Sequence, residues 1–481
     1  MIPLRVSVAA LFLFVCPFAL FAQNCPPPVD EPSDCSFPVP TAAPVVFAGD
    51  TGPMRVRKSA FELTTAEVTR LRLAFAKLRQ LAKDDPTDPR GWMLQANVHC
   101  WYCGGGNDQL AGEEIHDGFW FFPWHRTYLY TLEKILGQLV GDPTFALPYW
   151  DWDTPGRAML PPVYATPNDA TNSLFDVERG ATATSLMPAS LSAYGSAFAT
   201  VMAAPTTDLF MGQPAGIESN PGSLEGGPHG AVHIWTGQPS LLCEDGVADM
   251  GILATAAQDP IFFAHHANID RLWDVWLNTA ATPPHTNPIE PASGPVWRPH
   301  TWTYYDQNKV WYSIAVSDTI NHATSLHYTY QAPNTTGATP AHTMVMASPT
   351  ATKVTSAPHT ATISATPVAA VPPPAKPTVL HIDGIIVPPG AVAAVRVFIN
   401  LPTASPTTDA ADPHYVGIFT IVPHTSAARG HTKRRNIALA LSAANLQTIS
   451  GGSLNVTLVP VAAEGAPRSL NLTYEKIYIT R

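Results

Sequence analysis

The sequence predicts a mainly α-helical N-terminal domain followed by a C-terminal β-sandwich. Three observations on the 481 residues support this prediction. Most tryptophans, the grouped histidines and the helical apolar patterns lie between residue 23 and about residue 278. From Thr378 onward, short β-branched runs alternate and are separated by Gly and Pro. Between them, residues 332–375 are rich in Ala, Thr, Pro and Ser, which predicts an extended linker without a core.

The elements of each region follow from their periodicity. Apolar residues at helical spacing predict a helix over residues 62–81. From about residue 279, aromatic runs at 302–305 and 311–316 predict strands that pack back on the helical region, so the first domain is expected to span 23–331. The sandwich is expected to span 376–481, with strands at 379–382, 395–399, 418–422 and 454–459.

The first 22 residues resemble an export signal. Arg5 precedes an apolar stretch over 6–19, and Leu20, Phe21 and Ala22 form a plausible cleavage site. The alternative is a membrane anchor, but the apolar stretch is shorter than the roughly 20 residues that a spanning helix needs. We therefore expect a secreted or periplasmic protein with residues 1–22 as signal peptide and no later membrane span.

Charge and cysteine content narrow the classes of function. Charged residues make up 13% of the chain, and the net charge of −10 is spread along it, which excludes a basic nucleic-acid surface. Cys16 would be lost with the signal. The five remaining cysteines form an odd set, which in an exported protein requires an explanation: Cys25, Cys35, Cys100, Cys103 and Cys243.

Histidines are grouped in the second half of the helical region. His229 and His233 are four residues apart, so a helix would direct both rings to one face, although such pairs also occur by chance. His265 and His266 are adjacent and diverge by about 100° on a helix, so at most one is expected to face that site. A capped core helix with one surface histidine is the alternative for this pair.

A third group consists of His99, His116 and His125, the last of which lies in the aromatic segment 118–130. Taken alone, that segment could simply be core. Together the groups offer three plus three imidazoles from four helices and a loop. Imidazole suits copper, zinc, iron and nickel, so the ligand type does not select the metal. The scarcity of neighbouring carboxylates argues against a carboxylate-rich di-iron bundle or a magnesium site.

These motifs resemble the plant-type polyphenol oxidases of the catechol oxidase and tyrosinase family. His99-Cys100-Trp101-Tyr102-Cys103, then His116, then Pro123-Trp124-His125-Arg126 is similar to their first copper site, and the segment 142–153 follows as it does in that family. The resemblance implies a four-helix bundle around a type-3 dicopper site with two copper ions as cofactor. It implies these ligands: His99, His116 and His125 for copper A, and His229, His233 and His266 for copper B.

The resemblance also accounts for the odd cysteine. It implies a thioether between Cys103 and a ring carbon of His116. The remaining four cysteines would form two disulfides, and the family pattern favours pairing Cys100 with Cys25 or Cys35. Cys243 departs from the pattern and could take the remaining partner.

The implied reaction is oxidation of o-diphenols to o-quinones with reduction of O2 to water. A small phenol would stack on a ligand imidazole.

Four candidate residues surround the second copper. Glu225 stands at the position where members of the family have a Glu that holds a water molecule. Gly230 replaces an Asn that is frequent in hydroxylating members. Ile234, which follows the second histidine of this site, is an apolar neighbour. We therefore expect weak or no monophenol hydroxylation. Leu253 stands where plant enzymes often have a shielding Phe, so bulkier phenols are expected to enter.

The C-terminal regions resemble the domain that shields the active site in latent plant enzymes. Tyr328 and Tyr330 resemble the Tyr-x-Tyr that closes the copper domain, whereas two family tetrads are replaced at 301–303 and 394–397. We expect a latent proenzyme released by cleavage within 332–375; the alternative is a sandwich that only stabilises the protein or binds a surface. Rival functions are a dioxygen carrier, a dizinc hydrolase and a copper-sequestering protein without turnover.

Overall fold

The computed structural model describes most of the helical region and the strands of the C-terminal region. The described residues are 37–103, 114–180, 186–191, 193–213, 220–237, 249–290, 296–331, 352–354, 357–364, 377–388, 391–423, 433–449, 453–461 and 472–480. The predicted signal peptide and Cys25, Cys35 and Cys243 lie outside them. No helix in these ranges combines the length and the apolar character that crossing a membrane requires.

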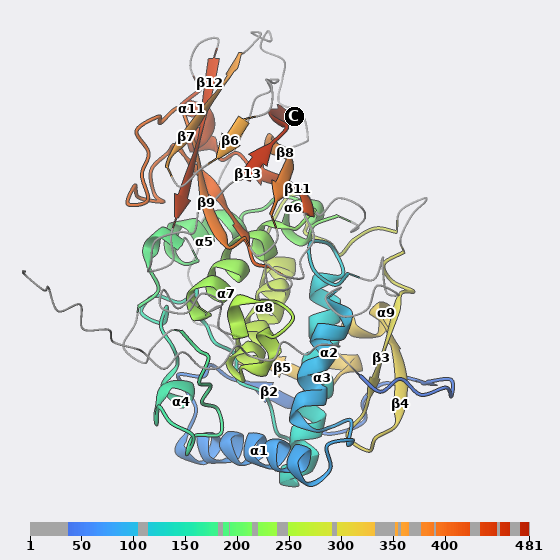
Figure 1. Cartoon of the computed structure of the whole chain (residues 1–481). Coiled ribbons are helices and arrows are strands. Elements are labelled where there is room, and N and C mark those ends of the chain that lie inside the picture. Colours follow the sequence, from blue (N-terminus) through green and yellow to red (C-terminus); the bar gives the residue numbers. More distant parts are fainter. Residues whose placement is uncertain are drawn as a thin grey trace, which may run out of the picture.

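A four-helix bundle forms the centre of the N-terminal region, as predicted (Figure 1). Its helices are α2 (Trp92–Tyr102), α3 (Phe121–Val140), α7 (Gly230–Thr236) and α8 (Ile261–Asn278). Helix α7 continues a π-helical turn, η3 (Glu225–His229), which contains Pro228. Almost every residue of α3 and α8 up to the last turns is buried, because other elements surround both helices.

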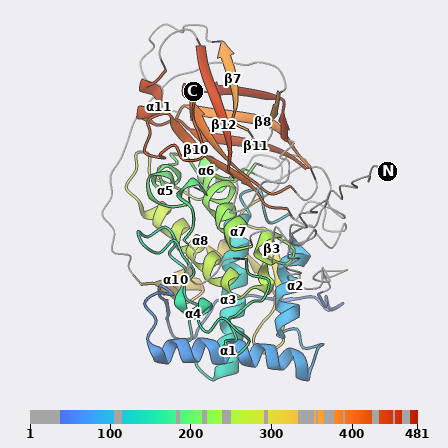
Figure 2. The ribbon, with the colours of Figure 1, turned by 60° about the vertical axis from the view of Figure 1, so that its left-hand side comes forward.

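Helix α1 (Thr65–Asp84) lies across the end of the bundle that is remote from the sandwich (Figures 1 and 2). It begins three residues later than the predicted helix over 62–81. The reason is a capping box, in which the Thr64 side chain accepts from the Glu67 N–H and Glu67 accepts from the Thr64 N–H. Short helical turns connect the larger elements: α4 (Pro162–Ala165), η2 (Ala189–Leu191), α5 (Gly195–Met202), α6 (Thr207–Met211), η4 (Asp249–Gly251), η5 (Ala256–Gln258), α9 (Val316–Thr319) and α10 (His322–Ser325).

Small sheets join the two ends of the helical region. Strands β3 (Thr301–Tyr305) and β4 (Trp311–Ala315) pair antiparallel, and β1 (Val45–Val46) pairs parallel with β4. These strands confirm the two predicted aromatic runs. Strand β2 (Arg55–Arg57) pairs parallel with β5 (Tyr328–Tyr330), so the segment containing the predicted Tyr-x-Tyr is anchored to the start of the domain.

The C-terminal region is a two-sheet β-sandwich, as predicted. One sheet has the order β10-β9-β12-β7, and the other has the order β11-β8-β13-β6 with β14 also paired to β8. Alternate side chains of the two sheets fill the core between them. The elements are β6 (Thr352–Val354), β7 (His359–Ser364), β8 (Val379–Val387), β9 (Ala393–Ile399), β10 (Tyr415–Ile421), β11 (Lys433–Ala440), α11 (Ala443–Gln447), β12 (Ser453–Val461), β13 (Leu472–Tyr474) and β14 (Lys476–Thr480).

The expected linker over 332–375 requires a correction. Within it, β7 pairs antiparallel with β12 from His359↔Leu458 to Ser364↔Ser453, and β6 pairs with β13. Both strands therefore belong to the sandwich. The composition misled the prediction because Thr and Ile are also strand formers, and an edge strand needs only one paired side and little apolar surface.

The sandwich packs directly on the bundle (Figure 2). Ile418, Val422 and Val461 of the sandwich belong to the same continuous apolar core as the helices of the bundle. Strand β10 also runs against η3, the turn that ends in His229. The two domains thus share buried apolar surface beside the grouped histidines.

Candidate dicopper site

Three histidines from the first half of the bundle converge. His99 is on α2, His125 is on α3, and His116 is on the segment between these helices. Their ring centroids are 5.1–5.5 Å apart, and all three side chains are buried. One nitrogen from each lies within 4.8 Å of the others, which is compatible with one shared metal ion.

The second group contains four histidines instead of the expected three. His229 and His233 come from η3 and α7, and both His265 and His266 of α8 lie within the same 4.8 Å limit. His125 of the first group stacks on His266 of the second, with centroids 4.0 Å apart and planes 9° apart. The two groups are therefore neighbours, as a dinuclear centre requires.

A hydrogen bond distinguishes the two adjacent histidines. Trp152 Nε1–H donates to His265 Nδ1 over 3.0 Å. An indole nitrogen is only a donor, so Nδ1 of neutral His265 must be the acceptor and its proton sits on Nε2. That tautomer leaves no lone pair on Nε2 for a metal. No such donor occupies a nitrogen of His266 in the described part of the chain.

Backbone carbonyls orient three of the other rings. His125 Nδ1 contacts the Phe121 carbonyl at 2.8 Å, His229 Nδ1 contacts the Glu225 carbonyl at 3.2 Å, and His233 Nδ1 contacts the Met250 carbonyl at 2.7 Å. A carbonyl only accepts, so each Nδ1 carries the proton and each Nε2 keeps its lone pair. Glu225 lies four residues before His229 in the π-helical turn η3, and this turn brings the Glu225 carbonyl within hydrogen-bonding distance of His229 Nδ1.

The inner nitrogens fit copper ions. Nε2 is buried and has no hydrogen-bond partner among the described residues in His99, His125, His229, His233 and His266. Burial, reinforced by neighbouring imidazoles, lowers the pKa of His99, His125, His229 and His266 well below the usual range, and burial lowers that of His233 to about 3. The rings are thus neutral, which is the form that binds a metal.

Glu225 lies within this shell, at the start of η3. Its Oε1 accepts from the Asp117 N–H at 2.5 Å, and its Oε2 is buried without a partner among the described residues. Burial, together with Asp117, raises the pKa of Glu225 well above its usual range, although Arg435 opposes the shift. Loss of the proton from this side chain is therefore disfavoured in this arrangement.

Gly230, Ile234 and Leu253 are all buried, and two of them touch the sandwich. The Leu253 N–H donates to the Pro423 carbonyl at 2.9 Å. A Cβ on Gly230 would lie 2.0 Å from Thr420 Oγ1, so the sandwich occupies the space that an Asn at position 230 would need. Ile234 lies on α7 one residue after His233.

Among the cysteines, Cys100 and Cys103 lie in the described part. Cys100 is disulfide-bonded, and its partner lies outside the described residues. Cys103 is buried at the end of α2, where its N–H donates to the His99 carbonyl at 3.0 Å. The thioether to His116 stays a prediction.

Sequence reasoning missed the residues that the sandwich contributes near the site. Thr420 Oγ1 donates to the Gly226 carbonyl at 2.9 Å, and Arg435 Nη2 lies 3.0 Å from Asp117 Oδ1, beside His116. Arg435 also donates to the Thr420 carbonyl at 3.1 Å. Thr420 and Gly226 are 194 residues apart in the chain, and Arg435 and Asp117 are 318 apart, so no local pattern could have indicated these contacts.

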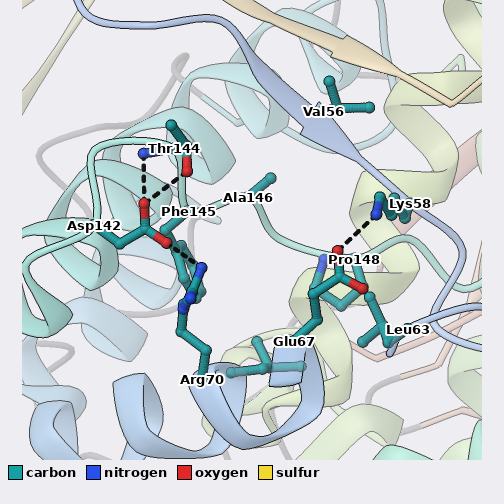
Figure 3. A pocket seen from close by; sticks show the side chains of 11 residues that line it. Val56, Lys58, Leu63, Glu67, Arg70, Asp142, Thr144, Phe145, Ala146 and Pro148 are labelled. Carbon is teal, nitrogen blue, oxygen red and sulfur yellow. Dashed lines mark hydrogen bonds and ion pairs between the residues drawn. The ribbon is translucent and has the colours of Figure 1, made fainter. Parts of the chain in front are cut away.

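A separate cavity beside α1 does not compete with the histidine site. It has a volume of about 130 Å³ and contains the ion pairs Arg70–Asp142 at 2.6 Å and Lys58–Glu67 at 2.6 Å (Figure 3). None of its lining residues is a histidine. Its charged groups are paired with one another, so this cavity is not a candidate for the catalytic site.

Comparisons with known proteins agree with this geometry. The common central domain of tyrosinase matches residues 89–188 and 177–279, and the chloroplastic polyphenol oxidase C-terminal domain matches residues 366–472. The chloroplastic polyphenol oxidase of Vitis vinifera is 35% identical over 340 residues, which cover 66% of this chain and 52% of that protein.

Solved structures show the same likeness. Latent apple tyrosinase has a TM-score of 0.73 at 26% identity, covering 91% of this chain and 99% of the other. Polyphenol oxidase from Grenache (Vitis vinifera) has a TM-score of 0.54 at 32% identity, covering 63% of this chain and 92% of the other. The two-domain arrangement is thus similar to that of latent apple tyrosinase.

A helical bundle with two adjoining groups of buried imidazoles defines the class of type-3 dicopper proteins. The chain belongs to the tyrosinase family, in the branch of the plant polyphenol oxidases. The histidine groups fit the two copper ions of that family. The chain spans about half the length of the curated relatives it matches, and several of these are named chloroplastic.

Proposed function

We propose that this protein oxidises o-diphenols to o-quinones, with reduction of O2 to water. The observation that carries the proposal is the pair of adjoining histidine groups, with five inner nitrogens that are buried, neutral and without a hydrogen-bond partner among the described residues. When bound, the two copper ions supply the redox chemistry between the diphenol and dioxygen.

The proposed ligands are those implied by the sequence. His99, His116 and His125 hold copper A, and His229, His233 and His266 hold copper B. The lone pairs left on Nε2 by the carbonyl contacts support these roles, and the Trp152 hydrogen bond supports the choice of His266 over His265. A thioether from Cys103 would fix the ring of His116.

The surroundings favour a small, flat and mostly neutral phenol. Phe121 lies 4.7 Å from the His229 ring, and Phe262 lies 4.2 Å from the His266 ring, so apolar faces flank the second group. A substrate ring stacked on a ligand imidazole would have its hydroxyl oxygens directed at the metal side. Leu253, smaller than Phe, leaves room for bulkier phenols once the sandwich is removed.

Hydroxylation of monophenols is proposed to be weak or absent. It requires a group that accepts the phenol proton. Burial and Asp117 raise the pKa of Glu225 well above its usual range, which disfavours the charged form in the docked arrangement. Gly230 provides no side-chain amide to polarise a water beside it, and Ile234 is apolar. The proposed reaction is therefore limited to substrates that already carry two adjacent hydroxyls.

We further propose that the sandwich keeps the enzyme latent. Its Thr420 and Pro423 hydrogen-bond the backbone around the second histidine group, and its Arg435 forms a buried ion pair beside His116. Access of a phenol to the copper pair would then require displacement of the sandwich, by cleavage between residues 332 and 351, ahead of β6. The competing idea is that the sandwich only stabilises the fold.

The deciding experiment is oxygen uptake by the copper-loaded protein with 4-methylcatechol, before and after limited proteolysis. Uptake that rises sharply on cleavage supports both the oxidation and the latency. Full uptake by the intact chain supports the proposed oxidase activity and contradicts the proposed latency. Absence of uptake in both forms with two coppers bound favours a dioxygen carrier or a copper-sequestering protein.

Export is the remaining part of the proposal. Residues 1–22 are proposed to act as a signal peptide for secretion or transfer to the periplasm. The disulfide of Cys100 supports an oxidising compartment. N-terminal sequencing of the mature protein after cell fractionation tests this assignment: a chain that begins near Gln23 outside the cytosol is expected, and an uncleaved cytosolic chain would contradict it.

A further inference from the structure

His116 is held in place differently from the other proposed copper ligands. The other five lie on α2, α3, η3, α7 or α8, so a helical turn fixes the backbone of each. His116 instead lies in a bend of the segment 114–120, between α2 and α3. Its ring centroid is 5.1 Å from that of His99 and 5.2 Å from that of His125. The ring keeps this place only if the backbone of the segment is itself fixed.

Asp117, the next residue, has a left-handed backbone conformation with a φ of 63°. Three other non-glycine residues of the described part share this conformation, and Asp117 is the one that is buried. The left-handed region is unfavourable for a residue with a Cβ, although Asp tolerates it better than most. Such a conformation persists where the surrounding structure enforces it.

Contacts from three separate segments enforce it here. The Asp117 N–H donates to Glu225 Oε1 at 2.5 Å, and the Asp117 carbonyl accepts from the Asn220 N–H at 3.0 Å. The carboxylate meets the sandwich, where Arg435 Nη2 lies 3.0 Å from Oδ1 and 3.1 Å from Oδ2. Asp117 and Arg435 are 4% and 5% exposed, so salt and water screen their ion pair little.

Together these contacts fix the rotation about the Asp117 N–Cα bond. The N–H lies on the His116 side of that bond, whereas the carboxylate and the carbonyl lie on the other side. The chain beyond is also fixed, because the Phe119 N–H donates to the Gln213 carbonyl at 3.1 Å and α3 begins at Phe121. Relaxation of φ to the usual value of about −63° would therefore turn His116, and not α3, by about a third of a full turn.

We propose that Asp117 is a positioning residue for His116, and that Arg435 of the sandwich stabilises it in this role. The docked sandwich thereby slows the loss of copper from the first histidine group, besides contacting the backbone around the second. The inference rests on the proposed role of His116 as a copper ligand. It does not depend on turnover, because the quantity that changes is the retention of copper.

The test is the release of both copper ions from the loaded full chain to excess EDTA, followed over time. His99→Ala removes a ligand of the first group, so the phase that this variant lacks belongs to that group. We expect Asp117→Ala to accelerate this phase about tenfold, because Ala lacks the carboxylate and disfavours a positive φ. The phase of the second group should stay unchanged, whereas a general loosening of the fold would accelerate both.

Two further variants separate the backbone from the ion pair. Asp117→Asn keeps a residue that tolerates a positive φ but removes the charge. It should accelerate release from the first group about threefold, and so should Arg435→Gln. The double variant should be no faster than either single variant, because both substitutions remove the same contact.

Lys309→Ala is the matched control. Lys309 has a similar φ of 64° and pairs with Asp88 at 2.7 Å, but it lies in the turn between β3 and β4 with a side chain that is 45% exposed. Its substitution removes an ion pair and disfavours a positive φ in the same way. Both phases of copper release should nevertheless match those of the wild type.

The outcomes distinguish this inference from the proposed function. A wild-type chain that binds no copper would overturn both. If the wild type binds two ions and Asp117→Ala releases them at the wild-type rate, or accelerates both phases equally, only the inference is overturned. Should Asp117→Ala fail to fold, the other two variants decide: additive effects of Asp117→Asn and Arg435→Gln, or no effect of either, would contradict a role of Arg435 through Asp117.

Discussion

His265 and His266 are adjacent, equally buried and part of the same histidine group, yet one hydrogen bond distinguishes them. The Trp152 N–H fixes the tautomer of His265, so its inner nitrogen carries a proton. His266 stacks instead on His125 of the first group. The sequence motif identified the pair, and only the structure gives a physical reason to choose between its members.

Copper content tests this distinction. We expect His266→Ala to reduce the bound copper from two ions to about one per chain, because the second site keeps only two good ligands. His265→Ala should retain two ions. Atomic absorption on the purified proteins measures both. Equal copper loss in the two variants would contradict the assigned tautomer.

Gly230 illustrates how a missing side chain serves the contact between domains. A Cβ at this position would lie 2.0 Å from Thr420 Oγ1 and 2.9 Å from Thr420 Cβ. Neither atom can move freely, because Thr420 is held in β10 and donates to the Gly226 carbonyl. The glycine therefore permits the close approach of the sandwich to the helix that carries His233.

Substitution of this glycine should loosen the sandwich without cleavage. We expect Gly230→Ala to raise the oxygen uptake of the intact chain about fivefold or more, since overpacking typically costs about 1–3 kcal/mol. The double variant Gly230→Ala with Thr420→Gly removes the clash but also the Thr420 hydrogen bond, so its uptake should lie between that of Gly230→Ala and that of the wild type. If Gly230→Ala leaves uptake unchanged while the cleaved enzyme is active, the contact does not maintain latency.

At the scale of elements, strand β2 brings two arginines into the interior. Arg55 and Arg57 both bind Glu133 of α3, at 2.8 and 2.9 Å, and Arg57 also reaches Asp270 of α8 at 3.1 Å. Arg126 contacts the same Asp270 at 2.6 Å. The parallel pairing of β2 with β5 adds the hydroxyl of Tyr328, which donates to Asp270 at 2.6 Å. One carboxylate thus joins two helices and two strands.

Asp270→Asn should be strongly destabilising. Removing the charge leaves buried arginines without full compensation, which typically costs about 3–5 kcal/mol. Burial alone would raise the pKa of Asp270, but Arg126 and Arg57 outweigh it and lower the pKa below the usual value. The carboxylate therefore contributes stability that is fully present above about pH 4 and is lost as the pH falls through the lowered pKa.

Urea unfolding of the copper-free protein at pH 7 and near pH 3 measures this contribution. The difference between wild type and Asp270→Asn should be large at pH 7 and smaller at low pH. Asp274→Asn is the control, because Asp274 lies one turn further along α8 and its side chain is 41% exposed. An equal effect of the two variants would contradict the proposed role of the network.

The sequence predicts an element where the periodicity or composition of that segment is itself distinctive. Helix α1 and most sandwich strands follow from such patterns, whereas the helices that carry His99, His125, His233 and His266 were expected from the family resemblance. The π-helical turn over Glu225–His229 does not, because Gly and Pro in that segment indicate only an irregular backbone. Strands β6 and β7 were predicted as linker, since an edge strand of Thr, Ala and Ile has the same composition as a mobile segment.

At the scale of the molecule, the ion pair between Arg435 and Asp117 joins the domains. Both side chains are buried, and Arg435 also donates to the Thr420 carbonyl of its own domain. Its neighbour Arg434 faces away and binds Glu475 within the sandwich. No sequence pattern distinguishes the two arginines, because the difference arises only when the domains dock.

These adjacent arginines form a matched pair for a test of docking. We expect Arg435→Gln to raise the basal oxygen uptake of the intact chain several-fold and to shift its cleavage midpoint to lower protease concentration. Loss of the Arg435 charge leaves the buried Asp117 carboxylate less compensated, which disfavours the docked arrangement. Arg434→Gln should behave as the wild type. Equal behaviour of both variants would show that the apolar contacts alone hold the sandwich.

The pairing of β2 with β5 has a consequence for how the chain could be divided. Strand β2, near the start of the helical domain, and β5, the last strand before the sandwich, lie side by side, with Arg55 opposite Tyr328. This pairing therefore holds the two ends of the helical domain together. Severing the backbone after Gln331 would cut the chain between the helical domain and the sandwich while β2 and β5 stay paired, so the two ends of the helical domain would still be held together.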